Sequence, residues 1–108
     1  MVVLLNTTVL TDYGTFSHFE ISEDEAKLVV QEAIEENNFL SAIGHKSTAE
    51  LLSEMWEVPI KTNHTPYVQS DKDKAIVFKL KGRPNKGKSL NKEELLKIGY
   101  SFSMIIKL

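Results

Sequence analysis

The sequence predicts an α/β (α+β) fold, with a mixed sheet of about five strands packed by about three helices. Short apolar runs of strand length alternate along the chain with longer stretches whose apolar residues recur at helical spacing. At Ser22, Ser47 and Asn91 a glutamate follows three residues later, a signature of a helix start. The 108 residues suffice for a single core, so we expect residues 1–108 to form one domain.

The first strand and the first helix are predicted near the start of the chain. Residues 2–6, VVLLN, form a nearly continuous apolar run, which is typical of a buried strand. Residues 11–16, TDYGTF, read as a turn or loop, because glycine interrupts regular structure. Ser22 and Glu25 form a capping box, and apolar residues at helical spacing follow it. We expect this helix to end at the asparagine pair at positions 37–38.

A short strand and a second helix are predicted in the middle of the chain. Residues 39–44, FLSAIG, indicate a short strand or an extended link. The helix after it should begin at Ser47, which pairs with Glu50 in a second capping box, and should stop before Pro59. Residues 66–69, PYVQ, read as another short strand.

The last part of the chain predicts two strands separated by a short helix. Residues 74–80, KAIVFKL, indicate a buried strand. Asn91 and Glu94 mark the start of the third helix, and Gly99 marks its end. Residues 100–108, YSFSMIIKL, close the chain as a strand. The expected order is strand, helix, strand, helix, strand, strand, helix, strand.

Composition excludes several classes of function. The chain has no cysteine, which excludes disulfide scaffolds, thiolate metal sites and cysteine nucleophiles. The first apolar run is too short for a secretory or membrane-spanning segment, and no basic residue precedes it. We therefore expect a cytoplasmic protein without membrane contacts.

Charge is distributed unevenly along the chain. Residues 1–60 hold eleven acidic and two basic side chains, whereas residues 61–108 hold eleven basic and four acidic ones. The basic side chains concentrate at Lys79, Lys81, Arg83, Lys86, Lys88 and Lys92. A positive field of this kind attracts phosphate groups. The same lysines would also protect strand edges, so charge alone leaves both interpretations open.

Residues 82–89, GRPNKGKS, fit the pattern of the phosphate-binding loop of nucleotide triphosphatases. The context does not fit, because only 19 residues follow Ser89 and they leave no room for a second acidic strand. The next helix should begin late, at Asn91, and Pro84 removes one amide donor from the loop. We expect no ATPase, although Arg83 and the neighbouring lysines remain candidate phosphate ligands.

The segment 42–50, AIGHKSTAE, is the strongest candidate for a chemical site. Amides at a helix start are unpaired and carry the positive end of the helix dipole, so they form an anion site. Gly44 allows the backbone to approach a ligand, and His45 would place an imidazole beside that site. Imidazole titrates near neutral pH and suits proton transfer at a phosphate ester. The alternative is an ordinary polar histidine in a helix-entry loop.

Other candidate residues carry less information. His18 and His64 stand alone in predicted loops, and the spacing of the histidines matches no metal-binding motif, so we expect no metal and no cofactor. Met55 and Trp56 are expected to lie in the core or at an interface.

Several motifs together resemble a known family, the viral ring nucleases, which are small type III anti-CRISPR proteins of viruses and mobile elements. The matching stretches are LLNTT, AIGHKSTAELL, R-x-x-x-G-K and L-x-x-E-E, and they cover nearly the whole chain in the same order. The I-G-H-x-S-T core is the specific part of the pattern.

The resemblance implies a homodimer that encloses cyclic tetra-adenylate and cuts it without metal to linear di-adenylates ending in 2′,3′-cyclic phosphate. It implies that His45 acts as general acid on the departing 5′-oxygen and that Arg83 binds phosphate. The implied ligand-binding residues are Asn6, Gly44, Ser47, Thr48, Arg83 and Lys86. Two positions depart from the family pattern: Lys86 stands where an acidic residue is usual, and His64 aligns with an arginine.

Two alternatives to the ring nuclease stay open. A non-catalytic protein would bind the cyclic oligonucleotide, or nucleic acid, through the basic half of the chain and leave it intact. An interaction protein that shares only the fold would have no affinity for such rings.

Overall fold

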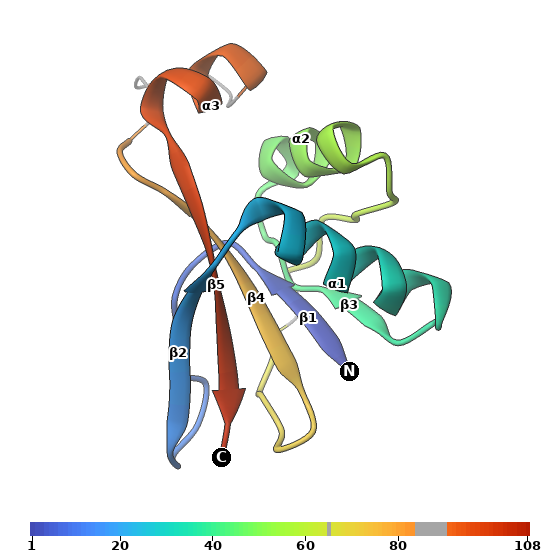
Figure 1. Ribbon diagram of the computed structural model, residues 1–108, viewed down its shortest axis with the longest axis vertical. Coiled ribbons are helices and arrows are strands. Elements are labelled where there is room, and N and C mark those ends of the chain that lie inside the picture. Colours follow the sequence, from blue (N-terminus) through green and yellow to red (C-terminus); the bar gives the residue numbers. More distant parts are fainter. Residues whose placement is uncertain (65, 84–90) are drawn as a thin grey trace.

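The computed structural model describes residues 1–64, 66–83 and 91–108, so the predicted ligand residue Lys86 lies outside the described residues. Eight elements follow one another along the chain (Figure 1). In chain order they are β1 (Val2–Leu5), β2 (Phe16–Ile21), α1 (Glu23–Glu35), β3 (Phe39–Ser41), α2 (Lys46–Trp56), β4 (Lys74–Leu80), α3 (Lys92–Ile98) and β5 (Tyr100–Lys107).

The five strands form one mixed sheet in the order β2-β5-β4-β1-β3. β1 runs parallel to both β3 and β4, whereas β5 is antiparallel to β4 and β2. This confirms the predicted mixed five-stranded sheet with three helices. Because β1, β3 and β4 point the same way, the chain leaves all three strands at the same edge of the sheet.

The main core lies between the helices and one face of the sheet, and Figure 1 shows α1 in front of β1 and β3. Side chains from all three helices reach this cluster, because each helix carries apolar residues at helical spacing on one side. Trp56 is 1% exposed and packs against Phe102 with ring centroids 5.2 Å apart, so its predicted core position is confirmed. A smaller cluster covers the opposite face, made of Val3, Leu5, Ala75, Val77 and Ile105.

Two strand predictions are wrong. Phe16–Ile21 forms strand β2, which the sequence analysis left without regular structure, and it pairs with β5 along its whole length. His18, which was expected in a loop, therefore lies in a strand, where its Nε2 is 2.9 Å from the Ser103 hydroxyl. Residues 66–69 form no strand; the N–H of Gln69 donates to the Thr11 hydroxyl at 2.7 Å instead of to a neighbouring strand.

The predicted starts of two helices are confirmed. The Ser22 hydroxyl accepts from the Glu25 N–H at 3.1 Å, and the Asn91 side chain accepts from the Glu94 N–H at 2.8 Å. Gly99 ends α3 as expected, with a φ of 84° that favours glycine. Among the described residues, no helix has both the length and the apolar character that crossing a membrane requires.

Candidate functional site

Helix α2 begins two residues earlier than the sequence predicts, and the side chain of its N-cap residue makes no capping hydrogen bond. His45 is the N-cap, with an extended backbone, and the first intrahelical bond runs from the Ala49 N–H to the His45 carbonyl at 3.1 Å. The predicted capping box of Ser47 with Glu50 is therefore wrong, because Ser47 already lies inside the first turn. No side chain within the described part of the chain caps this helix start. The first amides of a helix have no partner within the helix, so the amides of residues 46–48 are candidate donors to a bound anion.

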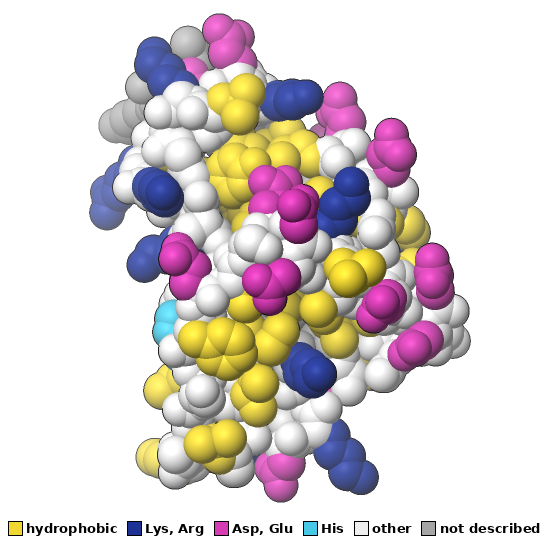
Figure 2. Space-filling view, in the orientation of Figure 1, with side chains coloured by type: hydrophobic (Ala, Val, Ile, Leu, Met, Phe, Trp, Pro, Cys, Tyr) yellow, Lys and Arg dark blue, Asp and Glu magenta, His cyan; other side chains and the backbone are white. Residues whose placement is uncertain are grey.

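The charges around this start favour an anion. The first turn of α2 holds no acidic residue, and His45 and Lys46 are both exposed there. Lys46 Nζ lies 3.8 Å from a carboxylate oxygen of Glu50, a pair on the solvent side of the helix. Figure 2 shows acidic side chains over the face that carries α1, and several Lys and Arg side chains around α3.

A second segment is bound firmly beside the start of α2. The Asn63 N–H donates to the Ile43 carbonyl at 2.8 Å, and the Asn63 side-chain amide donates to the Ser41 carbonyl at 2.7 Å. The Ser41 hydroxyl in turn donates to the Lys61 carbonyl at 2.6 Å. These bonds join residues 61–63 to the end of β3 and to the residues that connect β3 to His45.

This segment brings a second histidine to the site. The Nδ1 atom of His64 lies 3.6 Å from the place that a Cβ atom on Gly44 would occupy. Gly44 directly precedes His45, so both imidazoles belong to the same small region, and both side chains are exposed. From the sequence alone His64 is expected to stand alone in a loop, because a separation of 19 residues from His45 follows no helical or strand period.

The topology gathers most of the predicted site residues at one sheet edge. Asn6 follows β1, Gly44 and His45 follow β3, and Arg83 follows β4. Because these three strands are parallel, their carboxyl ends meet at this edge, the usual location of ligand sites in sheets of this kind.

Arg83 lies further out than the others. Leu5, the last residue of β1, pairs with Val77, and β4 continues for three more residues to Leu80, which is about 10 Å of strand. Arg83 comes after that extension and its side chain is exposed. It would therefore reach a ligand that extends beyond the start of α2.

A cavity of about 590 Å³ opens beside His45. It lies between the first turns of α2 and the start of α3, so it also includes Asn91 and Lys92, which the sequence analysis did not assign to the site. Their position follows from the topology, since α3 connects β4 to β5 at the carboxyl end of β4. The lining residues are His45, Lys46, Ser47, Glu50, Leu51, Glu54, Asn91 and Lys92.

The predicted site residues within the described part of the chain differ in how they can contact a ligand. Gly44, His45 and Ser47 lie together at the α2 start, with Asn6 and Arg83 at the same sheet edge. The side chain of Thr48 is buried, at 7% exposure, which leaves its backbone amide as its means of contacting a ligand.

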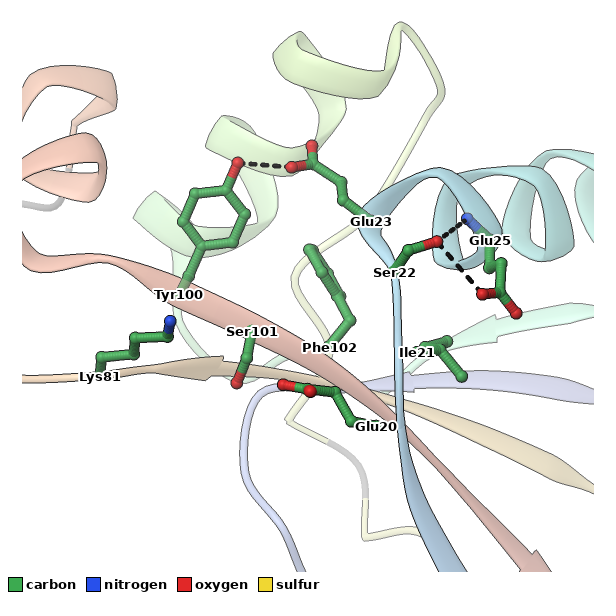
Figure 3. Close-up of a pocket in the computed structure, with 9 residues that line it drawn as sticks. All are labelled: Glu20, Ile21, Ser22, Glu23, Glu25, Lys81, Tyr100, Ser101 and Phe102. Atoms are coloured by element: carbon green, nitrogen blue, oxygen red, sulfur yellow. Dashed lines mark hydrogen bonds between the residues drawn. The ribbon is translucent and has the colours of Figure 1, made fainter.

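A second cavity, of about 500 Å³, lies between the start of α1 and β5 (Figure 3). Here the Glu23 carboxylate accepts from the Tyr100 hydroxyl at 2.5 Å and from the Trp56 Nε1–H at 3.3 Å. Burial, and then the bond to Glu23 and its charge, raise the pKa of Tyr100 to about 12. These bonds join α1, α2 and β5, so the polar side chains here have a structural function.

In the described part of the chain, no group of three or more His, Asp or Glu side chains could hold a metal ion. The expectation that the site works without metal stays a prediction.

Comparison with known proteins identifies the family. Residues 2–102 match the family described as STIV B116-like. The chain belongs to that family. It is 37% identical to protein 26 of Sulfolobus islandicus filamentous virus, over 76% of this chain and 67% of that protein. It is 30% identical to protein YddF of Bacillus subtilis, over 99% of this chain and 97% of that protein.

A solved structure shares the fold. B116 of Sulfolobus turreted icosahedral virus superposes with a TM-score of 0.81 at 21% identity, covering 97% of both chains. This likeness confirms the fold class. The viral relatives, which include ORF117 of Acidianus two-tailed virus at 33% identity, support the expected viral or mobile-element origin.

Proposed function

We propose that this protein is a metal-independent ring nuclease that binds cyclic tetra-adenylate as a homodimer and counters type III CRISPR signalling. The observation that carries the proposal is the start of α2, where an exposed histidine stands beside three amides without a side-chain cap. A phosphodiester bound to those amides would lie next to the imidazole.

The reaction needs alignment, charge stabilisation and a proton donor, and the site offers candidates for each. A ribose 2′-oxygen attacks the adjacent phosphorus, and the bond from phosphorus to the 5′-oxygen breaks. His45, in its protonated form, donates a proton to that departing oxygen. The α2 amides and Lys46 stabilise the charge that grows on the phosphoryl oxygens. The products are linear di-adenylates with 2′,3′-cyclic phosphate ends.

The size of the site favours a shared ring. A cavity of about 590 Å³ suits a ligand of drug size, and a ring of four nucleotides is larger than that. Two protomers related by a two-fold axis would each contribute one His45, which matches two cuts in a symmetric ring. Arg83, at the outer part of the same edge, would then contact phosphates away from the cleaved bond.

The test is incubation of the purified protein with labelled cyclic tetra-adenylate in the presence of a chelator, followed by chromatography of the products. We expect linear di-adenylates with cyclic phosphate ends from the wild type and intact ring from His45→Ala. Equal cleavage by His45→Ala would remove this residue from the reaction. Size-exclusion chromatography with light scattering checks the dimer separately.

A second candidate is a non-catalytic binding protein, which the basic second half of the chain favours. It predicts that the ring stays intact after long incubation and that binding weakens steeply with salt. The same chromatogram separates the two candidates, and a matching titration with single-stranded RNA tests for a nucleic-acid ligand.

A further inference from the structure

We propose that His64 is the second proton-transfer group of this site and accepts the proton of the attacking ribose 2′-hydroxyl. The inference rests on the proposed function, because it assigns a role within that reaction. The inference adds the identity of the proton acceptor, because the assignment of His45 as general acid names only the proton donor.

Position is the first argument. The His64 ring lies against Gly44, with Nδ1 3.6 Å from the place of a Cβ atom on that residue, and His45 is the next residue in the chain. The two imidazoles come from different segments, and both would adjoin a substrate whose phosphate is bound by the α2 amides, His45 inside the cavity and His64 beside its Gly44 end. Cleavage of a phosphodiester through its own 2′-hydroxyl needs a proton acceptor on one side and a proton donor on the other.

Rigidity is the second argument, because a proton acceptor must stay in place. Besides the bonds of Asn63 to β3, the Ser53 hydroxyl of α2 accepts from the Ile60 N–H at 3.0 Å and donates to the Ala49 carbonyl at 2.7 Å. The segment before His64 is thus attached to both β3 and α2. These hydrogen bonds fix the backbone next to His64, as a proton acceptor requires.

The other titratable groups near the site are less suited to accept this proton. Lys46, at the start of α2, and Lys61, in the same segment as His64, end in ammonium groups, which donate hydrogen bonds and have no lone pair to accept a proton. Glu50 lines the cavity but is paired with Lys46, with 3.8 Å between its carboxylate oxygen and the lysine Nζ, and Glu54 is one turn further along α2. The adjoining end of β1 contributes Asn6, which does not titrate.

The proposed step balances without a further reactant. The neutral imidazole of His64 takes the proton from the 2′-hydroxyl as its oxygen bonds to phosphorus. The bond to the 5′-oxygen breaks, and that oxygen receives a proton from His45. The enzyme ends with His64 protonated and His45 neutral, so His64 releases one proton to water and His45 takes one up, which restores both groups.

The test is the pH dependence of kcat/KM for cyclic tetra-adenylate in the wild type, His64→Gln and His64→Arg. A bell-shaped profile is expected for the wild type, because the proton acceptor must be neutral, which gives the acidic limb, and the proton donor must be protonated, which gives the alkaline limb. Both variants should lose the acidic limb and cleave about 10²–10⁴-fold more slowly, the usual range for a lost acid or base. Their affinity for the uncleavable 2′-deoxy ring should change little.

Matched controls make the outcome specific. His18→Gln removes an exposed histidine that lies far along the chain, on β2, and Glu50→Gln removes a carboxylate that lines the cavity; both should keep the acidic limb. Wild-type cleavage by His64→Arg would show that only positive charge matters at this position and overturn the proposal. Retention of the acidic limb by His64→Gln, or its loss in Glu50→Gln alone, would overturn it too.

Failure of this inference differs from failure of the proposed function. A wild type that leaves the ring intact at every pH contradicts the ring nuclease itself, and the inference falls with it. A wild type that cuts the ring, loses activity in His45→Ala and keeps it in both His64 variants contradicts the role of His64 alone.

Discussion

Helices α1 and α2 both begin just after a strand, but their first turns are built in opposite ways. In α1, Ser22 caps the helix and three acidic residues, Glu23, Asp24 and Glu25, follow in the first turn. In α2, no side chain of residues 1–64, 66–83 or 91–108 caps the helix, no acid occupies the first turn, and His45 and Lys46 stand there instead. Acids stabilise the positive end of a helix dipole, whereas basic groups there do not.

The difference indicates which helix start is organised for a ligand. The α1 start satisfies its own amides, and Glu23 is further bound by Tyr100 and Trp56. The α2 start leaves its amides open and adds positive charge, an arrangement that lowers stability until an anion binds. Local violation of a stabilising rule is expected at functional sites rather than in the scaffold.

The largest effect should follow from removing the imidazole at the α2 start. We expect His45→Ala to slow cleavage of cyclic tetra-adenylate by about 10²–10⁴-fold. Its free energy of unfolding should stay within about 0.5 kcal/mol of the wild type, since the side chain is exposed and makes no capping bond. Single-turnover kinetics and urea denaturation measure the two quantities. A large loss of stability with unchanged cleavage would reverse the assignment of this helix start.

A substitution at the start of α1 should lower stability and leave cleavage unchanged, the reverse of what we expect for His45→Ala. Glu23→Ala leaves the partly buried Tyr100 hydroxyl and Trp56 N–H without their acceptor, which should cost about 1–3 kcal/mol of stability. Cleavage per folded molecule should not change. Full loss of cleavage in this variant at a temperature where it stays folded would contradict the division between the two helix starts.

The hydrogen bond between Tyr100 and Glu23 also makes the stability depend on pH in the alkaline range. The pKa of Tyr100 is raised in the folded protein, to about 12, by burial and by Glu23. Its neutral form therefore favours the folded state, and this contribution is complete below the ordinary tyrosine pKa of about 10. It is lost as the pH rises from about 10 towards 12. Urea denaturation across that range should show a shallower decline for Glu23→Ala than for the wild type.

The fold was largely predictable because most elements carry their own local pattern. The strands at residues 74–80 and 100–107 and the caps at Ser22 and Asn91 follow from apolar spacing and from short-range hydrogen bonds. Strand β2 was not predictable in the same way. Its sequence, FSHFEI, has a weak alternation, and it is held by pairing with β5, more than 80 residues away in the chain.

The site was predictable only in part, for the same reason. His45 could be identified because it lies beside a helix start in the sequence. His64 and Lys92 join it through contacts between distant segments, which no local spacing encodes. The pattern Ser47-x-x-Glu50 was misleading, because two serine–glutamate pairs look alike in sequence, and only the backbone around His45 decides where α2 begins.

Those two serine–glutamate pairs provide the next comparison. Ser22→Ala removes a real cap and should lower the free energy of unfolding by about 1 kcal/mol. Ser47→Ala removes no cap and should change stability by less than about 0.5 kcal/mol, although it lines the cavity and is expected to weaken ring binding. Equal destabilisation by both variants, in the same urea titration, would restore the capping box at Ser47 that the structure contradicts.

Converting the α2 start into one that resembles α1 should produce a small gain in stability. His45→Ser places a preferred capping side chain at a position whose backbone is already extended, and its hydroxyl can accept from the amide of residue 47 or 48. We expect a gain of about 0.5–1 kcal/mol in the free energy of unfolding. The same bond occupies an amide that a phosphate would use, so affinity for the 2′-deoxy ring should fall, and more than in His45→Ala, which leaves the amides open. Binding by His45→Ser as tight as that of His45→Ala would show that the open amides do not hold the ligand, and the contrast between the two helix starts would then concern stability alone.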